Sequence, residues 1–353
     1  MNKLDSYIPR SGLSIPIVTV VDRAGNVPED EQLAVIRYAV QNGHGADIIF
    51  AVGTNGEWNR LDNQQRQRVF RIATDECRRL TAAGKPVEAW LGVTAHTRAE
   101  TLENLACSIE LAADAVVIAP LSIRDVDDCA GFIERDVAGV FERHGHAVPV
   151  FLYENEGIAA PGKPRHLDVG DVATLSRLDF VRGIKVTADR DILDLFVGAA
   201  TSFDKTHEFP IYAGNAYLIF DLMAPSKNID HHHRKPPLRG IVCGPANMTP
   251  REWKRAWEVT VAGDLPLMET YDALLDEFRQ ATFFKRGGGE IELGIAALKT
   301  SLMDAGVITS DLVAPGTEPF HGTEREEFIR RLRELRERAE AVVEPGWLSS
   351  WGK

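Results

Sequence analysis

Eight short apolar runs recur along the 353-residue chain, and segments with helical spacing separate them. The runs are rich in β-branched residues and continuously apolar, which is typical of strands covered on both faces of a parallel sheet. They are SIPIVTVV from Ser14, ADIIFAVG from Ala46, VEAWLGVTA from Val87, DAVVIAP from Asp114, VPVFLYEN from Val148, VRGIKVTA from Val181, FPIYAG from Phe209 and LRGIVCG from Leu238. Alternating strands and helices favour right-handed crossovers, and eight repeats close a barrel. The sequence therefore predicts an α/β fold, a (β/α)8 TIM barrel.

An open doubly wound sheet is the competing arrangement for such an alternation. That fold carries a glycine-rich phosphate turn after its first strand, and nothing after the run from Ser14 resembles one. The barrel is the favoured interpretation.

Helix-start signals divide the chain into two parts. Asp62 and Gln65 have the spacing of a capping box, and so do Thr249 and Glu252, with Pro250 at the first helical position. We expect the last barrel helix to begin there, so that residues 1–262 form the barrel that carries the active site and residues 263–353 form a C-terminal helical extension.

The C-terminal part is predicted to contain three helices, over 265–283, 290–304 and 323–343, with KRGGGE around Gly287 as a turn between the first two. The segment 225–237 is polar and bounded by prolines, and it predicts a loop before the eighth strand. Its three consecutive histidines, His231 to His233, do not have the spacing of a metal site, because adjacent side chains rarely converge on one ion. No metal and no cofactor are therefore expected.

The formal net charge of −12 argues against a nucleic-acid partner, because phosphate binding needs clustered Lys and Arg. The cysteines at positions 77, 107, 129 and 243 lie in apolar contexts without C-x-x-C spacing, which favours reduced core residues and a cytoplasmic protein. The start of the chain lacks the pattern of a signal peptide, and no apolar run approaches the roughly 18 residues of a membrane helix. We expect no membrane partner.

Chemistry in such a barrel belongs to the C-terminal ends of the strands, where Lys185 lies in an apolar run. A lysine in a water-poor barrel mouth has a lowered pKa, because burial disfavours its ammonium form. The free amine attacks the ketone of a 2-oxo acid and gives an iminium, which withdraws electrons from the neighbouring carbon. The alternative is a structural lysine that is ion-paired at a strand end.

Imine chemistry also needs a proton donor and acceptor, and Tyr153 at the end of the adjacent strand is the candidate. Thr54 is placed to hold or relay its proton. The alternative for a lone tyrosine is a side chain packed under a loop. Gly53, Thr54 and Asn55 belong to the stretch GTNGE, which combines glycines for a tight turn with groups suited to bind a carboxylate at a helix N-terminus.

These stretches together resemble the dihydrodipicolinate synthase/N-acetylneuraminate lyase family. The resemblance rests on GTNGE after the second strand, on the tyrosine ending the fifth, on GIK in the sixth, on YAGN in the seventh and on GIVCGPANMTP at the eighth. It implies a TIM barrel with a C-terminal helical region, usually tetrameric, that binds pyruvate or another 2-oxo acid as a Schiff base. We accordingly expect a homo-oligomer, either a tetramer or a dimer.

By that resemblance Lys185 forms the imine, Tyr153 moves protons with help from Thr54, and Asn55 helps to hold the substrate carboxylate. Gly214 and Val242 are implied to line the same pocket.

Three positions depart from the family pattern. Ile158 stands where the synthases usually have an arginine for the aldehyde's carboxylate, Ser122 stands near the place of a second tyrosine, and Glu154 replaces a usual asparagine. These departures argue against lysine biosynthesis. They favour a Schiff-base lyase or aldolase acting on pyruvate or a hydroxylated 2-oxo acid, with an aldehyde as the possible second small molecule. A dehydratase of a 2-oxo sugar acid and a barrel that binds a 2-oxo acid without turnover are the alternatives.

Overall fold

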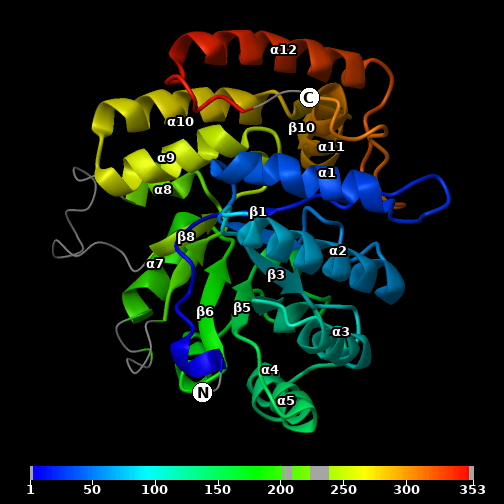
Figure 1. Ribbon diagram of the computed structural model, residues 1–353, viewed down its shortest axis with the longest axis vertical. Coiled ribbons are helices and arrows are strands. Elements are labelled where there is room, and N and C mark those ends of the chain that lie inside the picture. The colour runs from blue at the N-terminus through cyan, green and yellow to red at the C-terminus, as the bar shows by residue number, and fades with distance from the viewer. Residues whose placement is uncertain (1–2, 201–202, 204–208, 223–237, 350–353) are drawn as a thin grey trace.

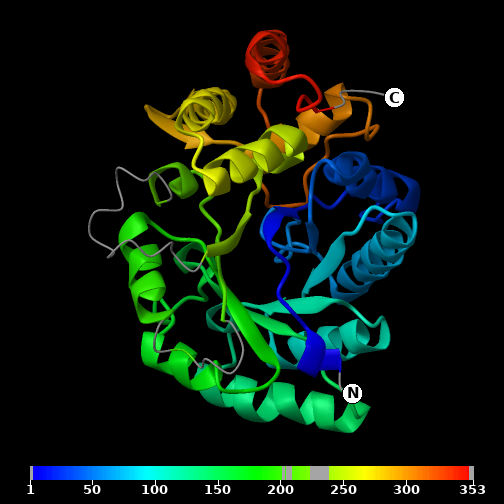
Figure 2. The same cartoon turned by 60° about the vertical axis from the view of Figure 1, so that its left-hand side comes forward.

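The computed structural model describes residues 3–200, 203, 209–222 and 238–349. Eight parallel strands form a closed barrel in sequence order, and β1 pairs with β8 (Figures 1 and 2). The strands are β1 Gly12–Pro16, β2 Ile48–Ala51, β3 Glu88–Gly92, β4 Ala115–Ile118, β5 Val150–Glu154, β6 Val181–Val186, β7 Ile211–Ala213 and β8 Leu238–Val242. The predicted TIM barrel is confirmed. The eight apolar runs are its strands, because each run must be buried both inside the barrel and beneath the outer helices.

The helices around the barrel follow the strands in the expected alternation. They are α1 Glu29–Val40, α2 Asn63–Ala82, α3 Arg98–Glu110, α4 Cys129–Gly131, α5 Ala138–His144, α6 Val169–Leu175, α7 Arg190–Ala199, α8 Leu218–Leu222 and α9 Pro250–Ala262. A π-helical stretch, Phe132–Val137, joins α4 to α5. Asp62 and Gln65 form the predicted capping box at the start of α2.

The second predicted capping box is wrong. Thr249 makes no side-chain cap at the start of α9, and the Glu252 carboxylate instead accepts hydrogen bonds from the backbone and hydroxyl of Ser349. A partner near the C-terminus has displaced the local one.

The C-terminal region contains α10 Leu265–Gln280, α11 Gly294–Asp304 and α12 Glu324–Val342, which stack beyond α9 and α1 on one side of the barrel (Figures 1 and 2). Between α10 and α11 the chain forms an antiparallel hairpin of β9 Phe283–Arg286 and β10 Gly289–Glu292. The expectation of helix at 281–283 and 290–292 is therefore wrong. The turn itself is where it was predicted, and Gly287 and Gly288 both have positive φ, which suits a two-residue hairpin turn.

The inside of the barrel beneath the strand ends is filled by aromatic rings. Trp90 stacks on Phe151 with ring centroids 4.0 Å apart, and the edge of Tyr212 meets both rings. Ile48, Val117 and Val242 belong to the same buried cluster. This packing gives the C-terminal mouth of the barrel a dry floor.

No helix in the described ranges is long and apolar enough to cross a bilayer. The four cysteines are free thiols. The predicted loop at 225–237, with its three histidines, lies outside the described residues.

Candidate active site

Lys185 lies one residue before the end of β6, where it pairs in register with Tyr153 of β5 and Tyr212 of β7. Its exposed fraction is only 5%. The side chain points into the barrel mouth, where its Nζ lies 3.7 Å from the centroid of the Tyr153 ring and 5.2 Å from that of Phe50. The amine therefore lies against aromatic faces, which attract a cation more weakly than a carboxylate does.

Burial lowers the pKa of Lys185 from its ordinary value, and negative charge on Tyr153 opposes that shift only in part. Among the described residues, the only charged partner that shifts the pKa of Lys185 is Tyr153, and no carboxylate does so. A larger share of the neutral amine is consequently present near neutral pH than on an exposed lysine.

The Tyr153 hydroxyl lies in a hydrogen-bonded cluster. It lies 3.2 Å from Thr54 Oγ1, and Asn155 Nδ2 donates to it at 2.8 Å. Burial alone would raise the pKa of Tyr153, but the charge of Lys185 and the hydrogen bond with Thr54 outweigh burial, so the net shift is downward. The phenol is thus prepared to give up and recover a proton.

Asn155 is a site residue that the sequence analysis missed. The stretch YEN could have indicated this role. Tyr153 and Asn155 are residues i and i+2 of an extended segment, and such residues project to the same side. Its side chain joins the two sides of the turn after β5, since Asn155 Oδ1 also accepts from Gly157 N at 3.0 Å.

The stretch GTNGE forms a strained turn between β2 and α2. Val52, just before the stretch, and Glu57, its last residue, have φ of +59° and +56°, a left-handed conformation that is rare for residues with side chains and especially for a β-branched one. Contacts from the C-terminal region hold this turn in place. Lys299 of α11 donates to the Glu57 carboxylate and to Leu312 O, while Ala314 N donates to Glu57 Oε1 at 2.7 Å.

Three of the seven predicted site residues are brought into direct contact, namely Lys185, Tyr153 and Thr54. Asn55 packs its amide against Gly244, where an added Cβ would approach within 2.8 Å of it. The chain needs glycine at that point of close approach.

The other predicted pocket residues lie around the same mouth. Gly53 borders a hollow beside Tyr153, and Val242 belongs to the buried cluster that contains Tyr153. Gly214 lies against Thr187, whose Oγ1 would come within 1.9 Å of a Cβ at this position. Their contact with a substrate stays a prediction.

Glu154 does not share the pocket with Tyr153. Successive residues of a strand point to opposite faces, and the fully buried Glu154 carboxylate accepts from Leu167 N at 2.7 Å and from His166 Nδ1 at 2.8 Å. These hydrogen bonds anchor the loop after β5 on the outside of the barrel.

The two other atypical positions lie near the mouth. Ile158, half-buried, borders the hollow beside Tyr153. Ser122 is buried, and within the described part of the chain its hydroxyl has no hydrogen-bond partner. Neither residue replaces the side chain that the family usually places there.

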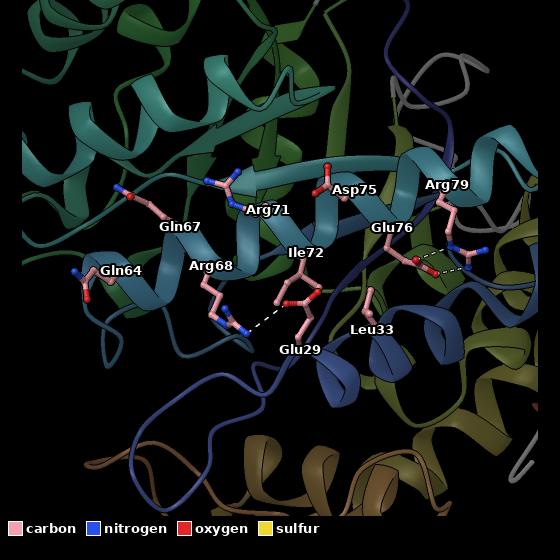
Figure 3. A pocket seen from close by; sticks show the side chains of 10 residues that line it. All are labelled: Glu29, Leu33, Gln64, Gln67, Arg68, Arg71, Ile72, Asp75, Glu76 and Arg79. Atoms are coloured by element: carbon pink, nitrogen blue, oxygen red, sulfur yellow. Dashed lines mark hydrogen bonds and ion pairs between the residues drawn. The ribbon is translucent and has the colours of Figure 1, made fainter.

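A second hollow lies on the outer surface between α1 and α2 (Figure 3). Its charges are largely paired with one another: Arg68 with Glu29, and Glu76 with Arg79 and Arg37. Burial would raise the pKa of Glu76, but the hydrogen bonds from Arg79 and Arg37 lower it to about 2. This groove is an ion-paired helix contact, remote from the barrel mouth.

No group of three or more His, Cys, Asp or Glu side chains suited to a metal ion is present in the described ranges.

The chain is similar to known proteins in both sequence and fold. The model of the dihydrodipicolinate synthetase family matches residues 9–116. A 4-hydroxy-tetrahydrodipicolinate synthase of Thioalkalivibrio sulfidiphilus is 24% identical over 322 residues, which cover 89% of this chain and 95% of that protein.

Two solved structures share the fold over nearly their whole length. YagE, a prophage protein of E. coli K12 from the dihydrodipicolinic acid synthase family that was solved in complex with pyruvate, has a TM-score of 0.70 at 20% identity and covers 92% of this chain and 98% of its own. The dihydrodipicolinate synthase of Bacteroides thetaiotaomicron has a TM-score of 0.74 at 17% identity, with coverages of 93% and 99%.

Proposed function

The chain belongs to the dihydrodipicolinate synthase/N-acetylneuraminate lyase family, and from this membership we propose that it is a lyase of the class I aldolase type that holds a 2-oxo acid as a Schiff base on Lys185. The observation that carries the proposal is the buried amine of Lys185, which lies over the ring of Tyr153. The Tyr153 hydroxyl is in turn hydrogen-bonded to Thr54. The pyruvate found in the structure of YagE supports a 2-oxo acid as the bound substrate.

This arrangement supports the following sequence of steps. The lone pair of the Lys185 amine attacks C2 of pyruvate, and a proton passes to the former ketone oxygen to give a carbinolamine. Tyr153 then donates a proton to the departing hydroxyl, which leaves as water, and the iminium forms. The Tyr153 phenolate then takes a proton from C3 and converts the iminium to an enamine, whose C3 is the nucleophile for carbon–carbon bond formation.

The remaining residues have supporting roles. Thr54 exchanges a proton with the Tyr153 hydroxyl, and Asn155 stabilises the phenolate by donating an N–H to it. Asn55 and the backbone N–H groups of its turn are suited to bind the carboxylate of the 2-oxo acid. The aromatic floor limits access of water, which favours the neutral form of the amine and protects the imine from early hydrolysis.

Reductive trapping tests this function. Incubation with pyruvate and borohydride is expected to add one reduced pyruvate to the chain, and the adduct is expected in the peptide that contains Lys185. The Lys185→Arg variant keeps the charge but lacks a nucleophilic amine, and it should form no such adduct. Absence of an adduct on the wild-type chain with every 2-oxo acid offered would overturn the proposal.

Product analysis then separates carbon–carbon from carbon–oxygen cleavage. An aldolase releases pyruvate from a 4-hydroxy-2-oxo acid, whereas a dehydratase gives water and a deoxygenated 2-oxo acid from a sugar acid. Both reactions start from the same imine on Lys185. Thermal stabilisation by a 2-oxo acid without any adduct would instead favour a binding protein.

A further inference from the structure

The turn formed by GTNGE is the part of the site suited to bind a carboxylate, and its backbone N–H groups fall into two pairs. The N–H groups of Gly56 and Glu57 donate to carbonyl oxygens earlier in the turn. Those of Thr54 and Asn55 donate to no acceptor in the described part of the chain. The side chain of Thr54 contacts Tyr153, so this second pair lies at the barrel mouth. Two adjacent N–H groups of this kind are what a turn offers to an anion.

A buried threonine in the segment after β1 holds this turn. Thr19 is completely buried, and its Oγ1 donates to Gly56 O at 2.9 Å. The two segments pack closely, because a Cβ on Gly56 would approach Thr19 Oγ1 within 3.2 Å and Ile17 O within 3.1 Å. Among the described residues, Thr19 is the one hydrogen-bond partner of the Gly56 carbonyl. Removing the hydroxyl would therefore leave a buried carbonyl unpaired.

The segment that carries Thr19 is itself fixed before and after this residue. The buried amide of Asn247 donates to the carbonyl at the end of β1 at 3.0 Å and accepts from Val18 N at 3.2 Å. The buried amide of Gln32 donates to Val18 O at 3.1 Å and accepts from Val20 N at 2.9 Å. Because the backbone is held on both sides, the Thr19 hydroxyl is a fixed support against which the turn is placed.

We propose that Thr19 is a positioning residue for the 2-oxo acid: its hydroxyl fixes the Gly56 carbonyl and thereby aims the N–H groups of Thr54 and Asn55 at the substrate carboxylate. Thr19 itself does not touch the substrate. This role rests on the function proposed above. The carboxylate is present in the bound substrate and in every later state, so these N–H groups stabilise the ground state and the transition state alike. Loss of the Thr19 hydroxyl should therefore weaken binding far more than it slows the chemistry.

Borohydride trapping with pyruvate tests this role, because it measures both the half-saturating pyruvate concentration and the maximal trapping rate. Thr19→Val should raise the half-saturating concentration about fivefold, the loss expected for one hydrogen bond, and leave the maximal rate within about twofold. Thr19→Ala, which places no methyl group against the Gly56 carbonyl, should give the same result. Thr19→Ser keeps the hydroxyl and should restore saturation to that of the wild type. An unchanged half-saturating concentration in the Val and Ala variants would overturn the proposal.

Acetone separates the placement of the carboxylate site from a general loss of structure. It forms the same kind of imine but has no carboxylate, so Thr19→Val and the wild type should trap it with equal second-order rate constants. The matched control is Thr282→Val in the C-terminal region, where the hydroxyl of the buried Thr282 donates to Arg279 O at 2.7 Å. This control should lose thermal stability, as Thr19→Val should, but keep the half-saturating pyruvate concentration of the wild type. Equal losses with acetone and pyruvate, or an equal shift in the control, would reduce Thr19 to a residue that only stabilises the fold.

The two proposals fail in different ways. If the wild-type chain forms no adduct with pyruvate or any other 2-oxo acid, the imine function fails, and the role of Thr19 fails with it. If the adduct forms on Lys185 and the Thr19 variants saturate as the wild type does, the imine function stands and the inferred role of Thr19 is wrong.

Discussion

Two lysines are buried among the residues that the structure describes, and they have opposite kinds of partner. Lys299 of α11 is completely buried against the carboxylate of Glu57, which is equally buried, and it also donates to Leu312 O. Lys185 of β6 instead lies against the aromatic rings of Tyr153 and Phe50. Burial lowers the pKa of both amines, and in each case the partner opposes the shift, namely the Glu57 carboxylate for Lys299 and Tyr153 for Lys185. The difference between the two lysines is therefore the partner itself: Lys299 is held in an ion pair with a carboxylate, whereas Lys185 faces aromatic rings.

The two lysines are also linked through one turn. Glu57 ends the stretch GTNGE, whose Thr54 contacts Tyr153 beside Lys185. The structural lysine thus holds the turn that supplies a proton-relay group to the proposed catalytic lysine. Through the contacts of Lys299 and Ala314 with Glu57, the C-terminal region helps to position the turn that contains Thr54.

The largest effect is expected for Lys185→Met. The variant should show no pyruvate adduct and no turnover, because no other amine lies against Tyr153 in the described part of the chain. Since methionine fills the space without a buried charge, thermal stability should be retained or increased. Mass spectrometry after borohydride reduction detects the adduct, and a melting curve measures the thermal stability. Full turnover by this variant would contradict the distinction between the two lysines.

The next largest effect is expected for Tyr153→Phe. Removing the phenolic oxygen takes away the proton donor and acceptor, so kcat should fall about 100- to 10,000-fold. The imine should still form, although slowly, because Lys185 remains in place. The time course of trapping and steady-state turnover measure the two steps separately. A kcat close to that of the wild type would show that a different group moves the proton.

Lys299→Met should act mainly on stability. It leaves the Glu57 carboxylate buried without a counter-ion, which lowers the free energy of unfolding by about 3–5 kcal/mol. The matched control is the double variant with Glu57→Gln, which removes both charges and should recover part of the loss. Denaturant unfolding measures the stability, and trapping at a temperature where the variant is folded should still label Lys185. Loss of the adduct in a folded Lys299→Met protein would contradict an effect confined to stability.

The smallest effect is expected for Asn155→Ala. One hydrogen bond to the phenolic oxygen is lost, worth about 1 kcal/mol, so kcat should fall roughly fivefold. The pKa of Tyr153 should rise, because its phenolate loses an N–H donor. The alkaline limb of the pH–rate profile should therefore move to higher pH. An unchanged profile would remove Asn155 from the proton-relay cluster.

Local pattern predicted the barrel well, because each strand depends on its own apolar run and each crossover on a nearby helix. The contact between Lys185 and Tyr153 was also predictable, since the two residues lie on adjacent strands and meet in register, whereas the reactivity of Lys185 stays a prediction. The capping box at Asp62 was confirmed for the same reason, as its partner is three residues away.

The wrong or missing predictions have two causes. Some contacts join residues that are far apart in the sequence, and the segment that forms the hairpin of β9 and β10 was interpreted as helical. Glu252 binds Ser349 and not the start of its own helix, and nothing local encodes that contact. The ion pair of Lys299 with Glu57 joins residues 242 positions apart. The hairpin of β9 and β10 was missed although its two-glycine turn is a recognised hairpin signal.

The most direct test of the account is the pH dependence of pyruvate attachment at Lys185. Only the neutral amine reacts, so a lowered pKa shifts the rise in attachment rate to lower pH. We expect Lys185 to reach half of its maximal rate below the ordinary lysine pKa of 10.5. A midpoint at or above 10.5 would contradict the claim that its aromatic, water-poor surroundings favour the neutral form of this amine.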